Sequence, residues 1–300
     1  MKILLTGPGF VGSKLKQKLI ENGHDVFSLV RPKSILDKEK NTFLGDITDF
    51  DRIYQIIKEL KPETVIHLAA LTPVRESFKQ PLLYQQINYL CTVNLVHACN
   101  KVLGNNFRFI MASTAEVYGE NGEDIKREGQ KLVPMSPYAI SKAAADMYVQ
   151  MCGNSFGLEY VLLRSNNTYG RPYSGYFVES MMEKLMANKL CDLYYANNTR
   201  DYMWVDDHIN GYLTVLEKGF GVYNVAPGEL ITNIGMCKLM KKIVGSTSEI
   251  KAIPAPDTRP SDHRGINMDS SQIRNLGWKP LTSRVDGILK LRQMYEEIKK

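Results

Sequence analysis

The stretch that decides the fold is Lys2-Ile3-Leu4-Leu5-Thr6-Gly7-Pro8-Gly9-Phe10-Val11-Gly12. It begins with an apolar run of strand length, and residues 13–20 after it have the apolar spacing typical of a helix. A strand, a G-x-G-x-x-G turn and a helix in this order predict a dinucleotide-binding unit, because the glycines let a pyrophosphate approach the helix N-terminus. We therefore expect Gly7, Gly9, Phe10, Val11 and Gly12 to contact a cofactor. The alternative is a glycine-rich turn that binds no ligand.

The end of the second expected strand, residues 25–30, indicates which cofactor is bound. When the adenosine ribose hydroxyls of NAD are bound, a strand at this place ends in Asp or Glu. This strand is followed by Arg31 and Pro32, with no acid. An arginine can pair with a 2′-phosphate, so the sequence favours NADP(H) over NAD(H), although a solvated arginine would look the same.

Strands and helices alternate through the first 170 residues and predict an α/β fold. In order, we expect a strand and turn at 42–49, a helix at 50–60 capped by Asp49, strands at 64–70, 107–112 and 159–164, and a long helix at 85–102. Short connections between such elements predict a Rossmann-type, doubly wound parallel sheet. Ligands of such sheets bind beyond the carboxyl ends of the strands, where the glycine turn, Ala69-Ala70 and Ser113-Thr114 all fall.

After Gly170 the alternation changes, which predicts a smaller, discontinuous C-terminal lobe that binds the substrate. A helix is expected at 177–188, another follows residues 200–207, and a charged amphipathic helix begins at about residue 283. We predict a dinucleotide-binding domain at 1–172, to which residues 199–225 return, and a substrate-binding lobe at 173–300.

Composition and charge narrow the class of ligand and the compartment. The net charge is +6, from 38 Lys and Arg against 32 Asp and Glu, and the basic residues form no nucleic-acid-binding tract. A small anionic ligand is the simpler expectation. The five cysteines are widely spaced without a C-x-x-C pair, which predicts buried thiols in a reducing compartment and no metal site. The first apolar run ends too early for a signal peptide and no stretch is long enough to span a membrane, so we expect a cytoplasmic protein.

Ser136-Pro137-Tyr138-Ala139-Ile140-Ser141-Lys142 contains a candidate acid/base pair. Tyr138 and Lys142 are four residues apart, which places them on one face of a helix, and Pro137 suits its first turn. A lysine ammonium near a phenol favours the phenolate and lowers a pKa of about 10. The alternative is a half-buried tyrosine beside a solvated lysine. His67, inside an apolar strand, is interpreted as a hydrogen-bonded core residue.

Further fragments cover nearly the whole chain in a consistent order. Besides the glycine turn they are Gly45-Asp46-Ile47-Thr48-Asp49, His67-Leu68-Ala69-Ala70, Asn88 with Thr92 and Asn94, Ser113-Thr114-Ala115-Glu116-Val117-Tyr118-Gly119, Ser136-Pro137-Tyr138 with Lys142, Arg164 with Asn167-Thr168-Tyr169-Gly170, Arg200-Asp201-Tyr202, Arg259-Pro260-Ser261-Asp262 and Leu276-Gly277-Trp278. Together they resemble the extended short-chain dehydrogenase/reductases, specifically the NAD(P)-dependent nucleotide-sugar epimerase/dehydratase family.

The resemblance implies site residues, a reaction and a partner. Thr114 would hydrogen-bond a sugar hydroxyl, Tyr138 would be its acid/base, and Lys142 would lower the Tyr138 pKa and hold the nicotinamide ribose. The implied chemistry is removal of a hydride from a ring carbon, usually C4, while Tyr138 takes the hydroxyl proton. Further cofactor contacts would be Asp46, Ile47, Leu68, Ala69 and Ala70. The nucleotide-diphosphate sugar would meet Asn167, Arg200, Arg259 and Asp262. A homodimer would form through residues 85–102 and 138–156.

The chain also departs from the family pattern. The glycine loop is one residue shorter than the usual G-x-x-G-x-x-G, Cys91 stands where Gly is usual, and Gly170-Arg171-Pro172 inverts the usual order of Pro and Arg. Ala115 replaces the Asp that one subgroup of sugar 4,6-dehydratases carries after its active-site Thr, while Glu116 remains.

These departures leave several functions open. A 4-epimerase working through a 4-keto intermediate is the first choice. A 4,6-dehydratase that uses Glu116 as a base and an NADPH-dependent 4-keto-sugar reductase are the alternatives within the family, and Glu116 as an ordinary surface carboxylate is the plain interpretation of that residue. From another class, the chain could be a non-catalytic cofactor-binding sensor, because fold does not fix function.

Overall fold

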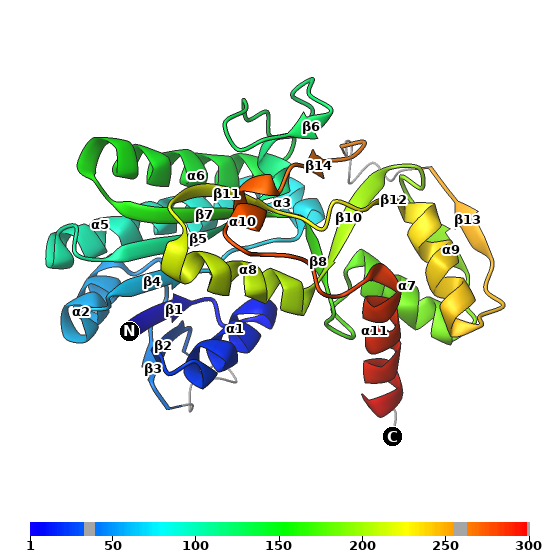
Figure 1. The fold of residues 1–300 in the computed structure, drawn as a ribbon, viewed down its shortest axis with the longest axis horizontal. Coiled ribbons are helices and arrows are strands. Elements are labelled where there is room, and N and C mark those ends of the chain that lie inside the picture. The colour runs from blue at the N-terminus through cyan, green and yellow to red at the C-terminus, as the bar shows by residue number, and fades with distance from the viewer. Residues whose placement is uncertain (33–39, 255–262, 299–300) are drawn as a thin grey trace.

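A seven-stranded parallel sheet forms the centre of the larger part of the molecule (Figure 1). The structure, a computed structural model, describes residues 1–32, 40–254 and 263–298. The strand order is β11-β7-β5-β4-β1-β2-β3. Their bounds are β1 Lys2–Thr6, β2 Asp25–Val30, β3 Thr42–Leu44, β4 Thr64–His67, β5 Arg108–Thr114, β7 Glu159–Ser165 and β11 Gly221–Val225. The predicted Rossmann-type α/β fold is confirmed.

Helices cover both faces of this sheet, and the side chains of β1 show how. Ile3 and Leu5 pack in the apolar cluster that contains α1 (Phe10–Glu21) and α8 (Val205–Lys218), whereas Leu4 packs in the cluster that contains α2 (Phe50–Leu60), α5 (Cys91–Leu103) and α6 (Pro137–Phe156). Successive side chains of a strand point to opposite faces, so a strand that is buried on both faces must be apolar throughout. This burial explains the apolar run of residues 3–5 in the middle of the strand.

Among the expected elements, one helix and one strand have different bounds in the structure, and one helix cap is as expected. The first helix begins at Phe10 rather than at residue 13, directly after Gly9. The strand expected at 64–70 ends at His67, because the chain turns there and Leu68–Ala70 lies beside the glycine loop. The cap of the helix at 50–60 is confirmed, because the Asp49 carboxylate accepts a hydrogen bond of 3.0 Å from the Arg52 backbone N–H.

The single helix expected at 85–102 is also corrected. Its place is taken by a π-helical turn (Gln85–Leu90) and α5, and two short helices, α3 (Val74–Lys79) and α4 (Pro81–Tyr84), precede them. Within the π-helical turn the buried Asn88 amide donates to the Leu71 carbonyl at 2.9 Å and to Ser141 Oγ at 3.0 Å. These contacts across the fold accompany the wider turn, and apolar periodicity could not indicate them.

Several of the remaining elements form a smaller part of the molecule, on the right in Figure 1. It contains the helices α7 Phe177–Met186, α9 Asn233–Val244 and α11 Arg284–Ile298, whereas the short helix α10 Ser271–Asn275 lies beside β11 of the large sheet. Small sheets join β8 Asn167–Tyr169, β10 Thr199–Trp204 and β12 Leu230–Thr232; β9 Cys191–Leu193 and β13 Ile250–Ala252; and β6 Ile125–Lys126 and β14 Asn267–Met268. The division into domains at 1–172 with 199–225, and 173–300, stays a prediction.

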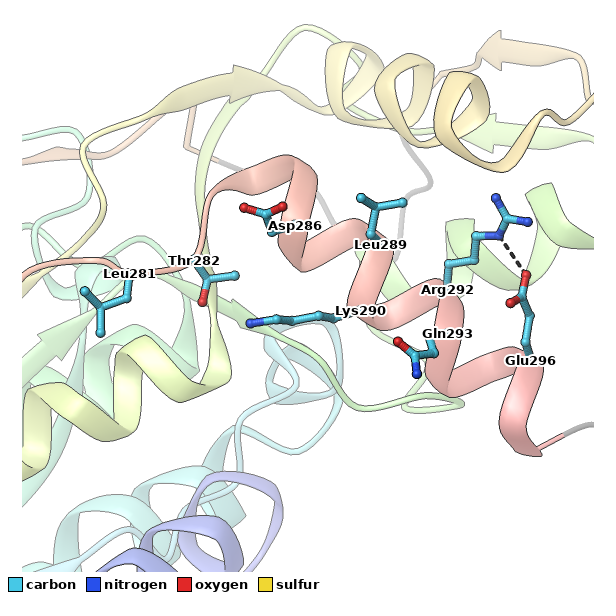
Figure 2. A pocket seen from close by; sticks show the side chains of 8 residues that line it. All are labelled: Leu281, Thr282, Asp286, Leu289, Lys290, Arg292, Gln293 and Glu296. Atoms are coloured by element: carbon cyan, nitrogen blue, oxygen red, sulfur yellow. Dashed lines mark hydrogen bonds and ion pairs between the residues drawn. The ribbon is translucent and has the colours of Figure 1, made fainter.

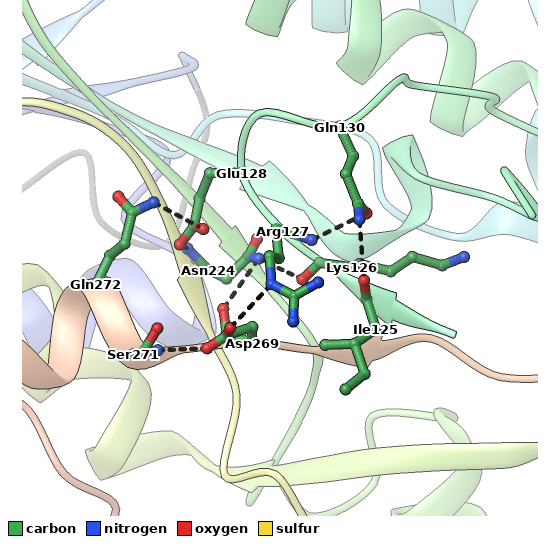
Figure 3. Close-up of polar contacts among 9 residues, drawn as sticks. All are labelled: Ile125, Lys126, Arg127, Glu128, Gln130, Asn224, Asp269, Ser271 and Gln272. Atoms are coloured by element: carbon green, nitrogen blue, oxygen red, sulfur yellow. Dashed lines mark hydrogen bonds and ion pairs between the residues drawn. The ribbon is translucent and has the colours of Figure 1, made fainter. Parts of the chain in front are cut away.

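A polar network fastens β6 and β14 to the large sheet (Figure 3). The Asn224 amide, on β11, donates to the carbonyls of Lys126 at 3.0 Å and Asp269 at 3.1 Å. The Asn224 backbone N–H donates to the Glu128 carboxylate at 2.9 Å. At the exposed edge of this network the Arg127 guanidinium pairs with Asp269 at 3.3 Å. Two segments far apart in the sequence are thus held together at the edge of the sheet.

The structure also bears on the expectations about cysteines, membrane spans and metal ions. All five cysteines are free and buried, as expected. In the parts of the chain that the structure describes, every helix falls short of the length and apolar character that a membrane span requires, and no cluster of His, Cys, Asp and Glu side chains could hold a metal ion.

Candidate active site

The helix α6 carries Tyr138 and Lys142 into the interior at the carboxyl end of the sheet. Ser136 caps it by accepting a hydrogen bond of 3.1 Å from the Ala139 N–H, and Pro137 occupies the first turn, where no N–H is needed. Tyr138 is 8% exposed and Lys142 is 3% exposed. The alternative of a solvated lysine is therefore wrong, and both polar ends lie in a largely dry environment.

Thr114, the last residue of β5, meets Tyr138 through a hydrogen bond between their side chains. The Thr114 hydroxyl also accepts from the Glu116 backbone N–H at 3.3 Å. On its other side the Tyr138 ring meets the Tyr84 ring edge-on, with 6.4 Å between ring centroids. The structure thus brings together two of the predicted catalytic side chains from separate elements.

The expected lowering of the Tyr138 pKa is not found. Burial raises the pKa of the Tyr138 phenol, and the negative charge of Glu116 acts in the same direction, while the hydrogen bond with Thr114 lowers it. Desolvation of the phenolate outweighs the favourable contact, which one-turn spacing on a helix could not reveal.

Burial has the opposite effect on Lys142 because it disfavours the ammonium. It lowers the pKa of Lys142 to about 8, against the attraction of Asp146, one turn further along α6. His67 faces the same buried region, where burial and the Lys142 charge lower its pKa to about 3. Its ring is therefore neutral and is hydrogen-bonded to Thr6 Oγ1 at 2.7 Å and to Thr92 Oγ1 at 3.0 Å. The interpretation of His67 as a core residue is supported by this geometry.

A buried ion pair supports the helix α6, and the sequence reasoning missed it. The Asp146 carboxylate accepts from Arg164 Nη2 at 2.8 Å, from Arg164 Nε at 3.0 Å and from Ser113 Oγ at 2.6 Å. Arg164 also donates to Tyr118 Oη at 2.9 Å. Each charge is almost fully buried. The available signal was an arginine inside an apolar strand together with an aspartate one turn after Lys142.

The glycine loop has the shape that a bound dinucleotide needs. Gly7 has φ +73°, and a Cβ there would lie 2.4 Å from the Ala69 N atom. A Cβ on Gly12 would lie 2.4 Å from the Gly7 carbonyl oxygen. By contrast, a Cβ on Gly9 would meet nothing within 4 Å, and Gly9 directly precedes α1. The loop is therefore packed on the side of Leu68–Ala70 and open at the helix N-terminus, which fits a pyrophosphate.

The predicted adenosine contacts lie together at the edge of the sheet. Arg31 is exposed and directly follows β2, while Asp46 and Ile47 follow β3, the next strand. Asp46 accepts hydrogen bonds from the backbone N–H and the hydroxyl of Thr48, at 2.9 and 2.7 Å. These bonds lower the Asp46 pKa, and the positive charge of Arg31 adds to the effect.

Of the four predicted substrate-binding residues, two lie in the described part of the chain. Asn167, at the start of β8, is exposed and lies opposite Tyr202 of β10. The buried Arg200 donates from Nη1 to the carbonyls of Thr199 at 2.7 Å and His263 at 3.3 Å. Arg259 and Asp262 lie outside the described residues.

Glu116 has a partner that sequence reasoning missed. His263 Nε2 lies 3.5 Å from the Glu116 carboxylate, and the histidine is buried. Its only signal in the sequence is its place beside the Arg259-Pro260-Ser261-Asp262 fragment. Glu116 lies in the short helical turn Ala115–Val117, and its role, as a base or as a surface or helix-edge carboxylate, stays a prediction.

A hollow of about 550 Å³ lies elsewhere, along α11 (Figure 2). Leu281, Leu289, Lys290 and Gln293 are among the eight residues that line it. None of the predicted site residues takes part. The hollow is therefore separate from the candidate active site.

Comparison with known proteins agrees with this geometry. A family model described as GDP-mannose 4,6 dehydratase matches residues 4–291. The chain belongs to this family. The predicted resemblance to extended short-chain dehydrogenase/reductases that act as nucleotide-sugar epimerases and dehydratases is thereby confirmed.

Relatives within the family carry different activities. The chain is 31% identical over 318 residues to a trifunctional UDP-glucose 4,6-dehydratase/UDP-4-keto-6-deoxy-D-glucose 3,5-epimerase/UDP-4-keto-L-rhamnose-reductase of Arabidopsis thaliana, covering 98% of this chain and 47% of the relative. It thus spans about half the length of that plant relative. It is 30% identical over 337 residues to a dTDP-glucose 4,6-dehydratase of Salmonella typhimurium, covering 98% of this chain and 92% of the relative.

Solved structures show the same fold in epimerases. A UDP-glucose 4-epimerase of Thermotoga maritima with UDP-glucose superimposes with a TM-score of 0.92 at 30% identity over the whole of both chains. A UDP-glucose 4-epimerase of Thermus thermophilus, in complex with NAD, has a TM-score of 0.89 at 28% identity, covering 99% of each chain. RMD of Pseudomonas aeruginosa, in complex with NADPH, has a TM-score of 0.83 at 26% identity, covering 99% of this chain and 100% of that one. Members of this fold therefore bind either nicotinamide cofactor.

Proposed function

We propose that the chain oxidises a ring carbon of a nucleotide-diphosphate sugar, in the first step of a 4-epimerase reaction. The observation that carries this proposal is the hydrogen bond between Thr114 and Tyr138, with Lys142 one turn further along α6, in a buried site at the carboxyl ends of the strands. A hydroxyl group held by Thr114 would lie within reach of the Tyr138 phenol. Proton transfer by a positioned side chain contributes about 10²–10⁴-fold in rate.

The protein side of the reaction is a proton transfer at Tyr138. A bound nicotinamide would supply the chemistry of hydride removal and return. As the sugar carbon loses its hydride, Tyr138 Oη takes the hydroxyl proton and a 4-keto sugar forms. Tyr138 must be in its phenolate form to accept this proton, and burial alone opposes that form. Lys142, whose pKa burial lowers to about 8, is still largely cationic at neutral pH and would stabilise the phenolate. If the hydride came back to the other face of the ring, Tyr138 would return the proton to the oxygen at C4, which would complete the inversion.

The surroundings of Thr114 favour epimerisation over dehydration. A 4,6-elimination needs an acid and a base near C5 and C6 of the sugar, and Ala115 offers neither. Glu116 could still act as a base, since its charge reaches Tyr138, so the 4,6-dehydratase is the second candidate. An NADPH-dependent 4-keto-sugar reductase would use the same three residues.

The products separate these reactions. The purified protein is incubated with UDP-, GDP-, CDP- and dTDP-sugars, with and without NADPH, and the products are identified by mass spectrometry, with the stereochemistry at C4 determined by NMR. An epimerase returns its bound cofactor unchanged and needs none to be added. A dehydratase forms a 4-keto-6-deoxy sugar, and a reductase oxidises NADPH stoichiometrically. A non-catalytic sensor would convert none of them, and three intact catalytic side chains in a buried site argue against it.

We also propose a preferred cofactor, a homodimer and a compartment for this protein. Arg31, exposed at the end of β2, supports a preference for NADP(H). A homodimer is supported by apolar side chains left exposed on α6 and the segment before α5, including Ile140 at 48%, Met147 at 60% and Leu90 at 49%. Size-exclusion chromatography with light scattering tests the dimer. Five free cysteines support the cytoplasm as the compartment.

A further inference from the structure

Arg171 lies beside the cofactor loop although it belongs to a distant part of the chain. It follows Gly170, directly after β8, and its side chain is exposed. Its guanidinium carbon lies 5.4 Å from the centroid of the Phe10 ring and 5.9 Å from that of Tyr176. In the described ranges no carboxylate forms an ion pair with it. An arginine stacked on aromatic rings keeps its N–H groups in the ring-parallel plane available for an anion.

The loop that carries Arg171 is fixed on the side of α7 and α11. The carboxylate of Glu179, which is 2% exposed, accepts hydrogen bonds from the backbone N–H groups of Gly170 at 2.9 Å and of Arg171 at 3.2 Å. The Tyr173 N–H donates to the buried Tyr295 hydroxyl at 2.9 Å. The position of Arg171 is therefore determined by buried groups.

The same loop is fixed on the cofactor side. The Tyr176 hydroxyl lies 2.7 Å from the Thr72 hydroxyl, and Thr72 comes two residues after Ala70, on the segment that packs against Gly7. Phe10 is the first residue of α1 and directly follows Gly9, the open glycine of the loop. Residues 170–176 thus connect the glycine loop and the Ala69–Ala70 segment.

The charges around Phe10 point to an anion. The first turn of α1 contains no acidic residue, so its positive helix end and the Arg171 guanidinium meet without a carboxylate of that turn between them. The glycine loop is also one residue shorter than the family pattern, and it therefore offers less backbone to a pyrophosphate. A guanidinium can replace backbone N–H donors with charge-assisted hydrogen bonds.

We propose that Arg171 binds the pyrophosphate of the dinucleotide cofactor and compensates for the shortened glycine loop. The inference rests on the proposed function only through the bound cofactor, and it holds whichever sugar reaction follows. The diphosphate of the substrate is the other anion of the same chemistry. Because Arg171 is stacked on Phe10 of the cofactor loop, the cofactor pyrophosphate is the one that we assign.

Titration calorimetry with the full-length protein tests this assignment. Arg171→Gln and Arg171→Lys are compared with Arg127→Gln, a control at the exposed arginine on the far edge of the sheet (Figure 3). We expect Arg171→Gln to weaken the binding of NADPH, NADH and ADP-ribose by the same factor, about tenfold, because all three contain the pyrophosphate. Arg171→Lys should weaken them less, and Arg127→Gln should leave them unchanged.

Two further ligands separate the possible sources of the anion. UDP and GDP should bind Arg171→Gln with the same affinity as they bind the unaltered protein. Raising the salt concentration should lower the affinity for ADP-ribose less in this variant than in the unaltered protein. Unchanged affinity for NADPH, NADH and ADP-ribose would overturn the assignment, and so would a loss confined to UDP or GDP. Thermal unfolding of each variant checks that it is folded. If the expected losses appear while no nucleotide sugar is converted, the assignment of Arg171 stands and the proposed reaction is wrong.

Discussion

The catalytic side of the site and its substrate side are built in different ways. On the catalytic side, Thr114, Tyr138 and Lys142 are buried and stand on regular elements. On the proposed substrate side, Asn167 is exposed, and Arg200 donates to the main-chain carbonyls of Thr199 and His263. We therefore propose that the shared chemistry depends on residues buried between the central strand β5 and the helix α6, while recognition of the particular sugar depends on the short strands β8 and β10 of the smaller part.

The largest expected effect is the loss of turnover in Tyr138→Phe. This variant removes the proton-transferring hydroxyl and keeps the ring that packs on Tyr84, so turnover should fall by about 10²–10⁴-fold. Cofactor affinity should stay unchanged, as measured by calorimetry. On the substrate side, Asn167→Ala should raise KM while kcat changes little. Equal losses of kcat in both variants would remove the contrast between the two sides.

The next largest effect concerns the support of the catalytic helix. Asp146→Ala leaves the Arg164 guanidinium buried without its partner, and loss of one partner of a buried pair costs about 3–5 kcal/mol of unfolding free energy. Urea unfolding followed by circular dichroism measures it. The matched control is Arg127→Gln, which breaks the exposed pair with Asp269 and should cost at most about 1 kcal/mol. A loss below about 1 kcal/mol for Asp146→Ala would mean that this network does not stabilise the catalytic side.

Acid should lower the free energy of unfolding because it protonates His67. Burial lowers its pKa to about 3 in the folded protein, whereas the unfolded chain has a value near 6.5, so the unfolded state binds more protons between these values. The contribution is fully present above pH 6.5 and is lost as the pH falls toward 3. At pH 4.5 it should cost about 2–3 kcal/mol relative to pH 7.

His67→Asn isolates this contribution, because asparagine can hydrogen-bond Thr6 and Thr92 without titrating in this range. The measured quantity is the difference in unfolding free energy between pH 7 and pH 4.5, which should shrink in the variant. An unchanged difference would show that the His67 ring is not held neutral.

The smallest effect is expected at the exposed edge of the cofactor site. Arg31→Asp replaces the partner of a 2′-phosphate with a repelling charge, so KM for NADPH should rise about tenfold more than KM for NADH. Arg171→Gln should raise KM for NADPH and KM for NADH by the same factor, so the same assay distinguishes the roles of the two arginines. Equal effects of Arg31→Asp on the two cofactors would remove the proposed preference for NADP(H).

The same contrast explains how much the sequence could predict. The strand, glycine turn and helix at the N-terminus and the spacing of Tyr138 and Lys142 are local patterns, and they led to the fold and to a pair that lies buried in the site. The ion pair between Asp146 and Arg164 joins a helix to a strand eighteen residues later, so neither periodicity nor motif indicates it. The raised pKa of Tyr138 depends on how much of the folded chain covers it, which one-turn spacing does not contain.

The π-helical turn at Gln85–Leu90 and the contact of His263 with Glu116 were missed for a related reason. Asn88 bonds to Leu71 and Ser141, and His263 meets a residue 147 positions earlier. Each depends on where the completed fold places a distant segment. Arg171 was visible only as a departure from the family order, and its position beside Phe10 came from the structure.

The central claim is that Thr114, Tyr138 and Lys142 carry out the oxidation of a nucleotide-diphosphate sugar. The most direct measurement is conversion of a panel of UDP-, GDP-, CDP- and dTDP-sugars by the unaltered protein and by Tyr138→Phe, with products identified by mass spectrometry and C4 stereochemistry by NMR. The account predicts that the unaltered protein converts at least one sugar to its C4 epimer and that Tyr138→Phe, still binding cofactor, does not. Conversion at the same rate by both proteins, or none by the unaltered protein, would contradict it.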